Sequence, residues 1–231
     1  MNSEPNYRGY RFPPEIISHA VWLYHRFTLS LRDIEDLLAE RNVIVSYESI
    51  RQWCNRFGLD YAKRLRKRRG PGGDRWFLDE VTVLIQGKRQ YLWRAVDQDG
   101  DVLDILLQSR KDKRAAKRFF RKLLKGQERT PIELTTDKLR SYGAAKREMM
   151  PSVVHCQDKY ANNRAEVSHE HAREQERQMR GFASSGQAQR FLSIHGQVHN
   201  LFRVGRQLRA VNYRVLRGRA FATWQEETCA Q

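Results

Sequence analysis

The chain has 231 residues, of which 40% are hydrophobic and 10% aromatic, enough for one large domain or a small and a medium one. Forty-three lysines and arginines against 27 acidic residues give a formal net charge of +16, which indicates a polyanionic partner, by default nucleic acid, more than a membrane surface. No apolar run of roughly 18 residues and no signal-peptide core occurs, so we expect an intracellular, cytoplasmic protein.

Residues 1–58 carry the pattern of a helical domain. The segment PPEIISHAVWLYHRF opens with two prolines and repeats apolar residues at helical spacing. Ser30 is placed to cap a second helix, and Asp33 stands three residues later as in a capping box. Ser46 then predicts the start of a third helix, SYESIRQWCNRF, with Gly58 at its end.

Two short helices joined by a tight connection are typical of a helix-turn-helix, whose later helix enters the major groove of DNA. On that helix Arg51, Gln52, Asn55 and Arg56 would reach base edges and phosphates. An ordinary three-helix bundle with a solvated polar face is the alternative, and the charge of the chain favours DNA contact over it.

Residues 59–75 read as a helix end that runs into a basic, glycine-rich linker. Six of the seven residues from 63 to 69 are basic, and three glycines and a proline follow. Unpaired positive charge here could lie along phosphates, or the segment could be a solvated hinge. The basic residues are Lys63, Arg64, Arg66, Lys67, Arg68 and Arg69.

From residue 76 the pattern changes to strands. WFLDEVTVLIQ, RQYLWRAVDQ and DVLDILLQ are separated by hairpin signals and predict three consecutive antiparallel strands. A helix in KDKRAAKRFFRKLLK, a strand in PIELTTD, a short helix, a strand in SVVHCQ and a long helix from about residue 162 to 180 follow. A last helix covers about 185–203, and the basic tail, 206–231, has no assignment.

Three acidic residues of this α/β region stand out by position. Asp79 lies inside the first strand, Asp137 at the end of the strand PIELTTD, and Glu166 in the first turns of the long helix. Such elements can bring three carboxylates to one point, where a divalent cation would relieve their repulsion. Oxygen ligands suit Mg²⁺ or Mn²⁺, and two ions about 3.5–4 Å apart can clamp a phosphodiester.

Other polar residues have simpler interpretations. Glu80 should point to the opposite face of its strand and serve as a salt-bridge or surface residue. The acids of DQDGDVLD lack the glycine and glutamate positions of a calcium loop, so they predict a hairpin turn. His169, near Glu166, is a weaker candidate for a part in phosphate orientation.

Three segments together resemble the insertion-sequence-six family of bacterial DDE transposases. They are FLDEVTVLIQGKRQYLWRAVDQDGDVLDILLQSRKDKRAAKRFFRKLL, TTDKLRSYGAAKREMMPSVVH and NNRAEVSHEHAREQER. The resemblance covers essentially the whole chain. It implies an RNase H-like (retroviral-integrase) catalytic domain at 76–205, with a mixed five-stranded sheet. This domain would follow the all-α helix-turn-helix domain in the sequence. The resemblance places the catalytic, metal-binding acids on Asp79, Asp137 and Glu166, and a basic partner on Arg173.

The function that this resemblance implies is binding of the element's terminal inverted repeats and Mg²⁺-dependent cleavage and strand transfer into target DNA. Since two DNA ends must be joined in one event, we expect a homodimer or higher oligomer on double-stranded DNA. A bacterial location at the nucleoid follows. Two rivals stay open: a non-catalytic helix-turn-helix protein, either a repressor or a domesticated or decayed transposase, and an RNase H-like nuclease that cuts without joining.

Overall fold

The computed structural model describes residues 6–137, 139–157, 162–179, 181–203 and 210–229, and only some of the side chains of the helix from Asn163 to Gln178. The chain divides into two compact units, one of residues 1–68 with 197–231 and one of residues 69–196. No helix in the described part is long and apolar enough to cross a membrane.

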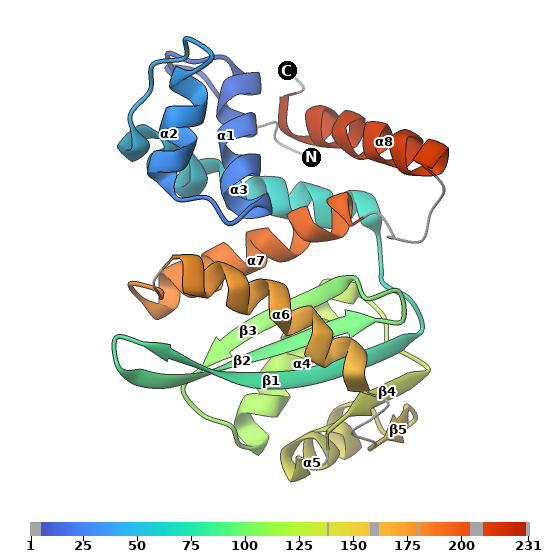
Figure 1. Ribbon diagram of the computed structural model, residues 1–231. Coiled ribbons are helices and arrows are strands. Elements are labelled where there is room, and N and C mark those ends of the chain that lie inside the picture. The colour runs from blue at the N-terminus through green and yellow to red at the C-terminus, as the bar shows by residue number, and fades with distance from the viewer. Residues whose placement is uncertain (1–5, 138, 158–161, 180, 204–209, 230–231) are drawn as a thin grey trace. The chain divides into compact units, whose positions relative to one another are not determined.

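The first unit is all helical, and its second helix begins as the sequence predicts. The Ser30 hydroxyl accepts a hydrogen bond from the Asp33 amide at 3.1 Å, and the Asp33 carboxylate accepts one from the Ser30 amide at 2.7 Å. This reciprocal pair satisfies two amides that a helix start leaves without partners. The helices are α1 (Pro14–Arg26), α2 (Leu31–Ala39), α3 (Tyr47–Arg69), the end of α7 (Ser185–Phe202) and α8 (Ala210–Cys229) (Figure 1).

The third helix is longer than expected, and this corrects the predicted linker. Gly58 does not end α3, which continues to Arg69. Phe57, Tyr61 and Leu65 repeat every four residues and are all buried, so their burial outweighs the cost of about 1 kcal/mol for a glycine inside a helix. Residues 59–69 are therefore helical, and only the few residues after them connect α3 to the first strand.

The basic tail also has a structure that the sequence pattern did not reveal. Its helix α8 contacts α1, and the Trp224 side chain is 3% exposed, with its ring centroid 5.5 Å from that of Tyr61 on α3. Glu227 pairs with Arg64 at 3.3 Å. The residues described from 210 to 229 thus belong to the first helical unit instead of forming a separate tail.

The second unit is built on a mixed five-stranded sheet with strand order β3-β2-β1-β4-β5. The first three strands are antiparallel neighbours, whereas β4 pairs in parallel with β1 and β5 in parallel with β4. The strands are β1 (Arg75–Ile85), β2 (Lys88–Asp97), β3 (Val102–Gln108), β4 (Glu133–Thr136) and β5 (Val154–Cys156). Helices α4 (Lys113–Gln127) and α5 (Arg140–Met149) connect the last three strands.

Alternation along β1 separates the two faces of the sheet. Trp76 and Leu78 pack with Phe119 of α4 and Tyr142 of α5 in one buried cluster. Helix α6 (Asn163–Gln178) contacts β1 and β2 and crosses them in Figure 1. It lies against the residues of β1 that alternate with those of the cluster, so α6 covers one face and α4 with α5 the other.

The acidic turn between β2 and β3 confirms the hairpin interpretation. Asp97 accepts hydrogen bonds from the amides of Asp99 and Asp101 at 3.0 and 2.9 Å, and from the amide of Gly73 at 3.2 Å. Asp104 pairs instead with Lys122 of α4 at 2.5 Å. These carboxylates bind backbone amides, Arg69 and Lys122, as the acids of a structural turn do.

Candidate active site

The strand register places Asp79 and Asp137 side by side. Leu78 of β1 pairs in parallel with Thr136 of β4, so the next residue on each strand is an aspartate at the same level of the sheet. Asp79 lies within β1, and Asp137 follows directly after the last residue of β4. Parallel pairing of a central strand with a shorter neighbour therefore produces the convergence that the sequence predicted for these two acids.

Asp137 is held by the loop that it opens. One of its carboxylate oxygens accepts a hydrogen bond from the Leu139 amide at 2.9 Å. The Thr136 hydroxyl donates to the Asp137 carbonyl at 2.8 Å. Local bonds of this kind fix an aspartate at a strand end while leaving its second oxygen for other ligands.

Glu80 joins the two aspartates, which the sequence analysis did not foresee. One oxygen each from Asp79, Glu80 and Asp137 can be chosen so that all three lie within 4.8 Å of one another. Glu80 does form a salt bridge, as predicted, but its side chain is only 1% exposed, so the predicted surface role is excluded. As successive residues of a strand, Asp79 and Glu80 start on opposite faces of the sheet. A Glu80 carboxylate oxygen nevertheless lies close to the two aspartates.

Lys111, in the connection between β3 and α4, is the partner of Glu80. Its Nζ lies 2.5 Å from the Glu80 carboxylate. Burial raises the pKa of Glu80, and the bond to Lys111 opposes that rise without cancelling it. Partial burial alone would lower the pKa of Lys111, but its hydrogen bond to Glu80 raises that pKa overall. Burial and then the Glu80 charge raise the pKa of the buried Tyr142 hydroxyl beside them.

On the face of the sheet that α6 covers, Asp79 contacts His169. His169 Nε2 lies 3.5 Å from the Asp79 carboxylate, and the His169 side chain is 1% exposed. Burial, followed by the charges of Arg94 and Arg173, lowers the pKa of His169 well below its usual range. At neutral pH the imidazole is therefore uncharged, and its contact with Asp79 is not an ion pair.

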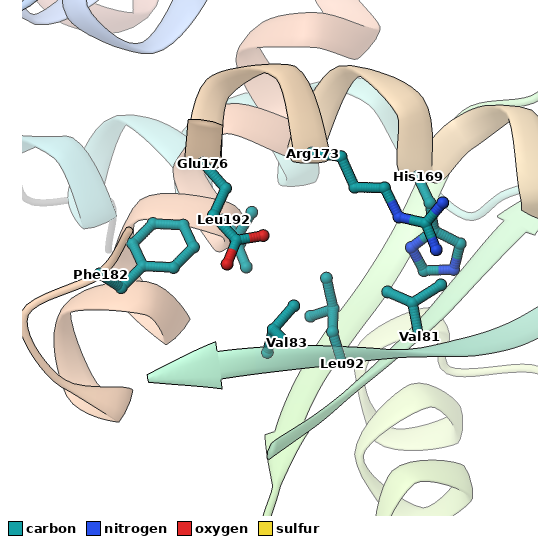
Figure 2. A pocket seen from close by; sticks show the side chains of 8 residues that line it. All are labelled: Val81, Val83, Leu92, His169, Arg173, Glu176, Phe182 and Leu192. Carbon is teal, nitrogen blue, oxygen red and sulfur yellow. The ribbon is translucent and has the colours of Figure 1, made fainter. Parts of the chain in front are cut away.

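Of the two predicted site residues on α6, the structure describes the side chain of one. Glu166 lies in the first turns of α6, as expected, but its side chain is outside the described part of the chain. Arg173 is described, and it lines a cleft with His169, Val81 and Glu176 (Figure 2). Positions 166, 169 and 173 follow helical spacing, so their backbones lie on one stripe of α6.

The acidic cluster fits a divalent metal. All three donors are carboxylates, the ligands that Mg²⁺ and Mn²⁺ prefer, and their spacing allows a shared ion. Within the described part of the chain, no other set of three or more histidines, cysteines or acids comes as close together. Asp79 and Asp137 are both partly exposed.

All ten predicted DNA-binding residues lie on α3. Arg51, Gln52, Asn55 and Arg56 are exposed, although Arg51 forms a 2.6 Å ion pair with Glu48 one turn earlier. They therefore form a polar surface on the helix that follows the turn.

Several basic residues at the end of α3 form ion pairs, which the sequence did not predict. Arg64 pairs with Glu227 at 3.3 Å, Arg68 with Glu226 at 2.7 Å, and Arg69 lies 3.7 Å from Asp101. Acids distant in the sequence therefore pair with part of this positive charge, and contact of the segment with phosphates stays a prediction. Lys63 and Lys67 are exposed, and Lys63 lies 3.6 Å from Asp60 on the same helix.

Comparisons with known proteins identify the class. A family model described as "DDE domain" matches residues 73–205. The transposase for insertion sequence-like element IS431mec of Staphylococcus aureus is 34% identical over 172 residues, which cover 72% of this chain and 76% of the relative. The transposase for insertion sequence element IS257 in transposon Tn4003, also from Staphylococcus aureus, is 33% identical over the same shares.

Among solved structures, the HTLV-2 integrase catalytic core domain in complex with magnesium aligns with 59% of this chain and 90% of its own, at 11% identity and a TM-score of 0.39. The sheet order, with its antiparallel meander followed by two parallel strands, is that of an RNase H-like domain. The second unit is thus the catalytic domain of a DDE polynucleotidyl transferase. The chain belongs to the insertion-sequence-six family of DDE transposases, and this membership implies an activity on DNA that depends on a divalent metal.

Proposed function

We propose that this transposase binds the terminal inverted repeats of its insertion sequence, cleaves the element's ends and joins them to target DNA. The observation that carries this proposal is the placement of Asp79 and Asp137 side by side, each directly after the paired residues Leu78 and Thr136. Two carboxylates so close together repel one another unless a cation lies between them. A phosphate-binding metal is the cation that the transposase family calls for.

In this proposal Asp79, Asp137 and Glu166 hold two Mg²⁺ or Mn²⁺ ions, and Arg173 contacts the DNA beside them. When bound, the ions supply charge stabilisation for the attacking and leaving oxygens of an in-line displacement. The carboxylates would fix where the phosphodiester sits, and the hydrogen bond that the Leu139 amide donates to Asp137 keeps one of them in place. First water and then the new 3′-hydroxyl act as the nucleophile.

We assign recognition of the terminal repeats to the helix-turn-helix of residues 1–58, with α3 as the helix that enters the major groove. The exposed side chains of Arg51, Gln52, Asn55 and Arg56 support this role. Lys63, Lys67 and the other basic residues up to Arg69 would track phosphates, those in ion pairs exchanging an acid for a phosphate. Joining two ends in one event requires a dimer or a larger assembly on the DNA, at the nucleoid.

The test is a strand-transfer reaction with labelled terminal-repeat duplexes, a target plasmid and Mg²⁺, scored for joined products. We expect joining by the wild type and a loss of at least about a thousandfold in Asp79→Asn, Asp137→Asn and Glu166→Gln, since a catalytic ion contributes several kcal/mol. Binding of the duplex should persist in all three. Asp99→Asn, an exposed acid of the β2–β3 turn, is the matched control and should join DNA normally.

Each rival function has its own signature in the same reaction. A repressor or decayed transposase would bind the repeat without nicking it at any Mg²⁺ concentration. A nuclease of the same fold would release cut ends and yield no joined product. Joining at the wild-type rate by Asp137→Asn would contradict the assignment of the acids themselves.

A further inference from the structure

The salt bridge between Glu80 and Lys111 lies at the edge of the acidic cluster and has no part in the proposed chemistry. The Glu80 side chain is 1% exposed, and its Oε1 atom is 2.5 Å from Lys111 Nζ. Burying a carboxylate away from water is costly unless a cation accompanies it. Lys111 provides that cation, and its own side chain is 36% exposed, so it can leave without crossing the core.

The same carboxylate is within reach of the proposed metal site. Oxygens of Asp79, Glu80 and Asp137 lie within 4.8 Å of one another, so an ammonium bonded to Glu80 also acts on the other two acids. On the other face of the sheet, the buried Arg94 is in register with Asp79. On the Glu80 side of the cluster, the ammonium of Lys111 supplies the balancing charge.

We propose that Lys111 is the internal counter-ion of the metal-free site, and that a divalent ion must compete with it for the acidic cluster. This inference rests on the proposed metal site at Asp79 and Asp137. Lys111 is a positioning residue in this scheme: it weakens metal binding and holds the site together when no metal is present. Glu80 is then a third carboxylate that contributes to the affinity for the metal.

A purely structural salt bridge would behave differently. If the pair only fastened β1 to the loop before α4, its loss would destabilise the protein equally with and without metal. If Lys111 competes with the metal, its loss removes positive charge from beside the three acids, which then repel one another more strongly until an ion binds. The two explanations therefore predict different changes in stability when metal is added to the variant.

The experiment measures Mn²⁺ binding by calorimetric titration, and the thermal midpoint in EDTA and in saturating Mn²⁺, for the full chain and its variants. Lys111→Met should bind Mn²⁺ at least about tenfold more tightly than the wild type. Its midpoint should fall in EDTA and return toward the wild-type value in Mn²⁺. Lys113→Met, which removes a partner of Glu148 on the surface two residues away, is the matched control and should bind Mn²⁺ as the wild type does.

Glu80→Gln keeps the shape of the side chain and serves if Lys111→Met does not fold in EDTA. It should weaken Mn²⁺ binding at least about tenfold, because it removes one acid and leaves the ammonium in place. Wild-type affinity in both Lys111→Met and Glu80→Gln, while Asp79→Asn abolishes binding, would overturn the role of Lys111 and leave the metal site intact. Failure of the wild type to bind Mn²⁺, or unchanged binding in Asp79→Asn, would overturn the metal site itself.

Discussion

Asp79 and Arg94 face each other across β1 and β2, in direct register on the face that α6 covers. The Arg94 side chain is 1% exposed, and its Nε and Nη1 atoms make no hydrogen bond within the described part of the chain. Burial lowers the pKa of Arg94 to about 10, so the guanidinium is charged at neutral pH. A buried cation directly behind a proposed metal ligand is costly for stability, which indicates that its value lies in function.

Replacement of Arg94 by methionine tests whether this arginine contributes to activity instead of stability. Because the buried charge lacks hydrogen bonds at two of its nitrogens, Arg94→Met should leave the free energy of unfolding unchanged or increase it. Strand transfer should fall, since Asp79 loses the positive charge behind it, and Arg94→Lys should restore part of the rate. Denaturant unfolding and the joining assay measure the two effects. A loss of several kcal/mol in stability would instead make Arg94 a structural residue.

Removal of the arginine side chains on α3 should weaken binding to the terminal repeat. Arg51→Ala and Arg56→Ala should each cost about 1–3 kcal/mol if they contact base edges, and less if they contact phosphates. A base contact would also relax the sequence preference, whereas a phosphate contact would lower the slope of affinity against salt by about one unit.

Gel-shift titrations at several salt concentrations measure both quantities. Arg118→Ala removes the same charge from an exposed position on α4 and serves as the control. Equal affinities in Arg51→Ala, Arg56→Ala and the control would move recognition to another surface.

Truncation of Trp224 tests whether α8 is part of the first helical unit. This side chain is buried against Tyr61 of α3, and Phe202 lies nearby with a ring-centroid distance of 6.2 Å from Trp224. Trp224→Ala should therefore cost about 3–5 kcal/mol of stability in that unit, as for other large aromatic truncations. Chemical denaturation followed by circular dichroism measures the loss. A cost below about 1 kcal/mol would mean that α8 is dispensable for the unit.

His25 should make the first unit sensitive to mild acid. Its imidazole is buried in α1, where Nδ1 donates to the Val21 carbonyl at 2.8 Å, and burial lowers its pKa from 6.5 to about 4. The unfolded chain therefore binds a proton between pH 6.5 and 4 that the folded chain does not. Stability should fall as the pH decreases through this window, by about 3 kcal/mol in total.

His25→Gln should abolish that part of the pH dependence while keeping a hydrogen-bond donor near Val21. Unfolding free energies at pH 7, 6, 5 and 4 for both proteins give the difference directly. An identical slope in the variant would assign the acid sensitivity to other groups.

The sequence predicted those parts of the fold that depend on local patterns. The Ser30 cap, the β2–β3 turn at Asp97 and the order of strands and helices all follow from residues close together in the chain. The end of α3 was predicted wrongly because Gly58 is a strong local stop signal. Burial of Tyr61 and Leu65, which depends on distant partners, overrides it.

The parts of the site that depend on local patterns could also be predicted from the sequence. The positions of Asp79 and Asp137 at the centre and the end of strands indicated convergence, and the parallel register provides it. The salt bridge of Glu80 was predicted, but its place beside the two aspartates and the burial of Arg94 were not, because they depend on Lys111 and on neighbouring strands, which no local pattern reveals. A charged residue inside an otherwise apolar strand, as in YLWRAVD, was the available signal for Arg94.

The most direct test of the metal site is the anomalous scattering of crystals soaked in Mn²⁺. The account predicts a peak about 2–2.3 Å from carboxylate oxygens of both Asp79 and Asp137, lost in Asp137→Asn crystals. Wild-type crystals with ordered density for both carboxylates and no manganese between them would contradict it.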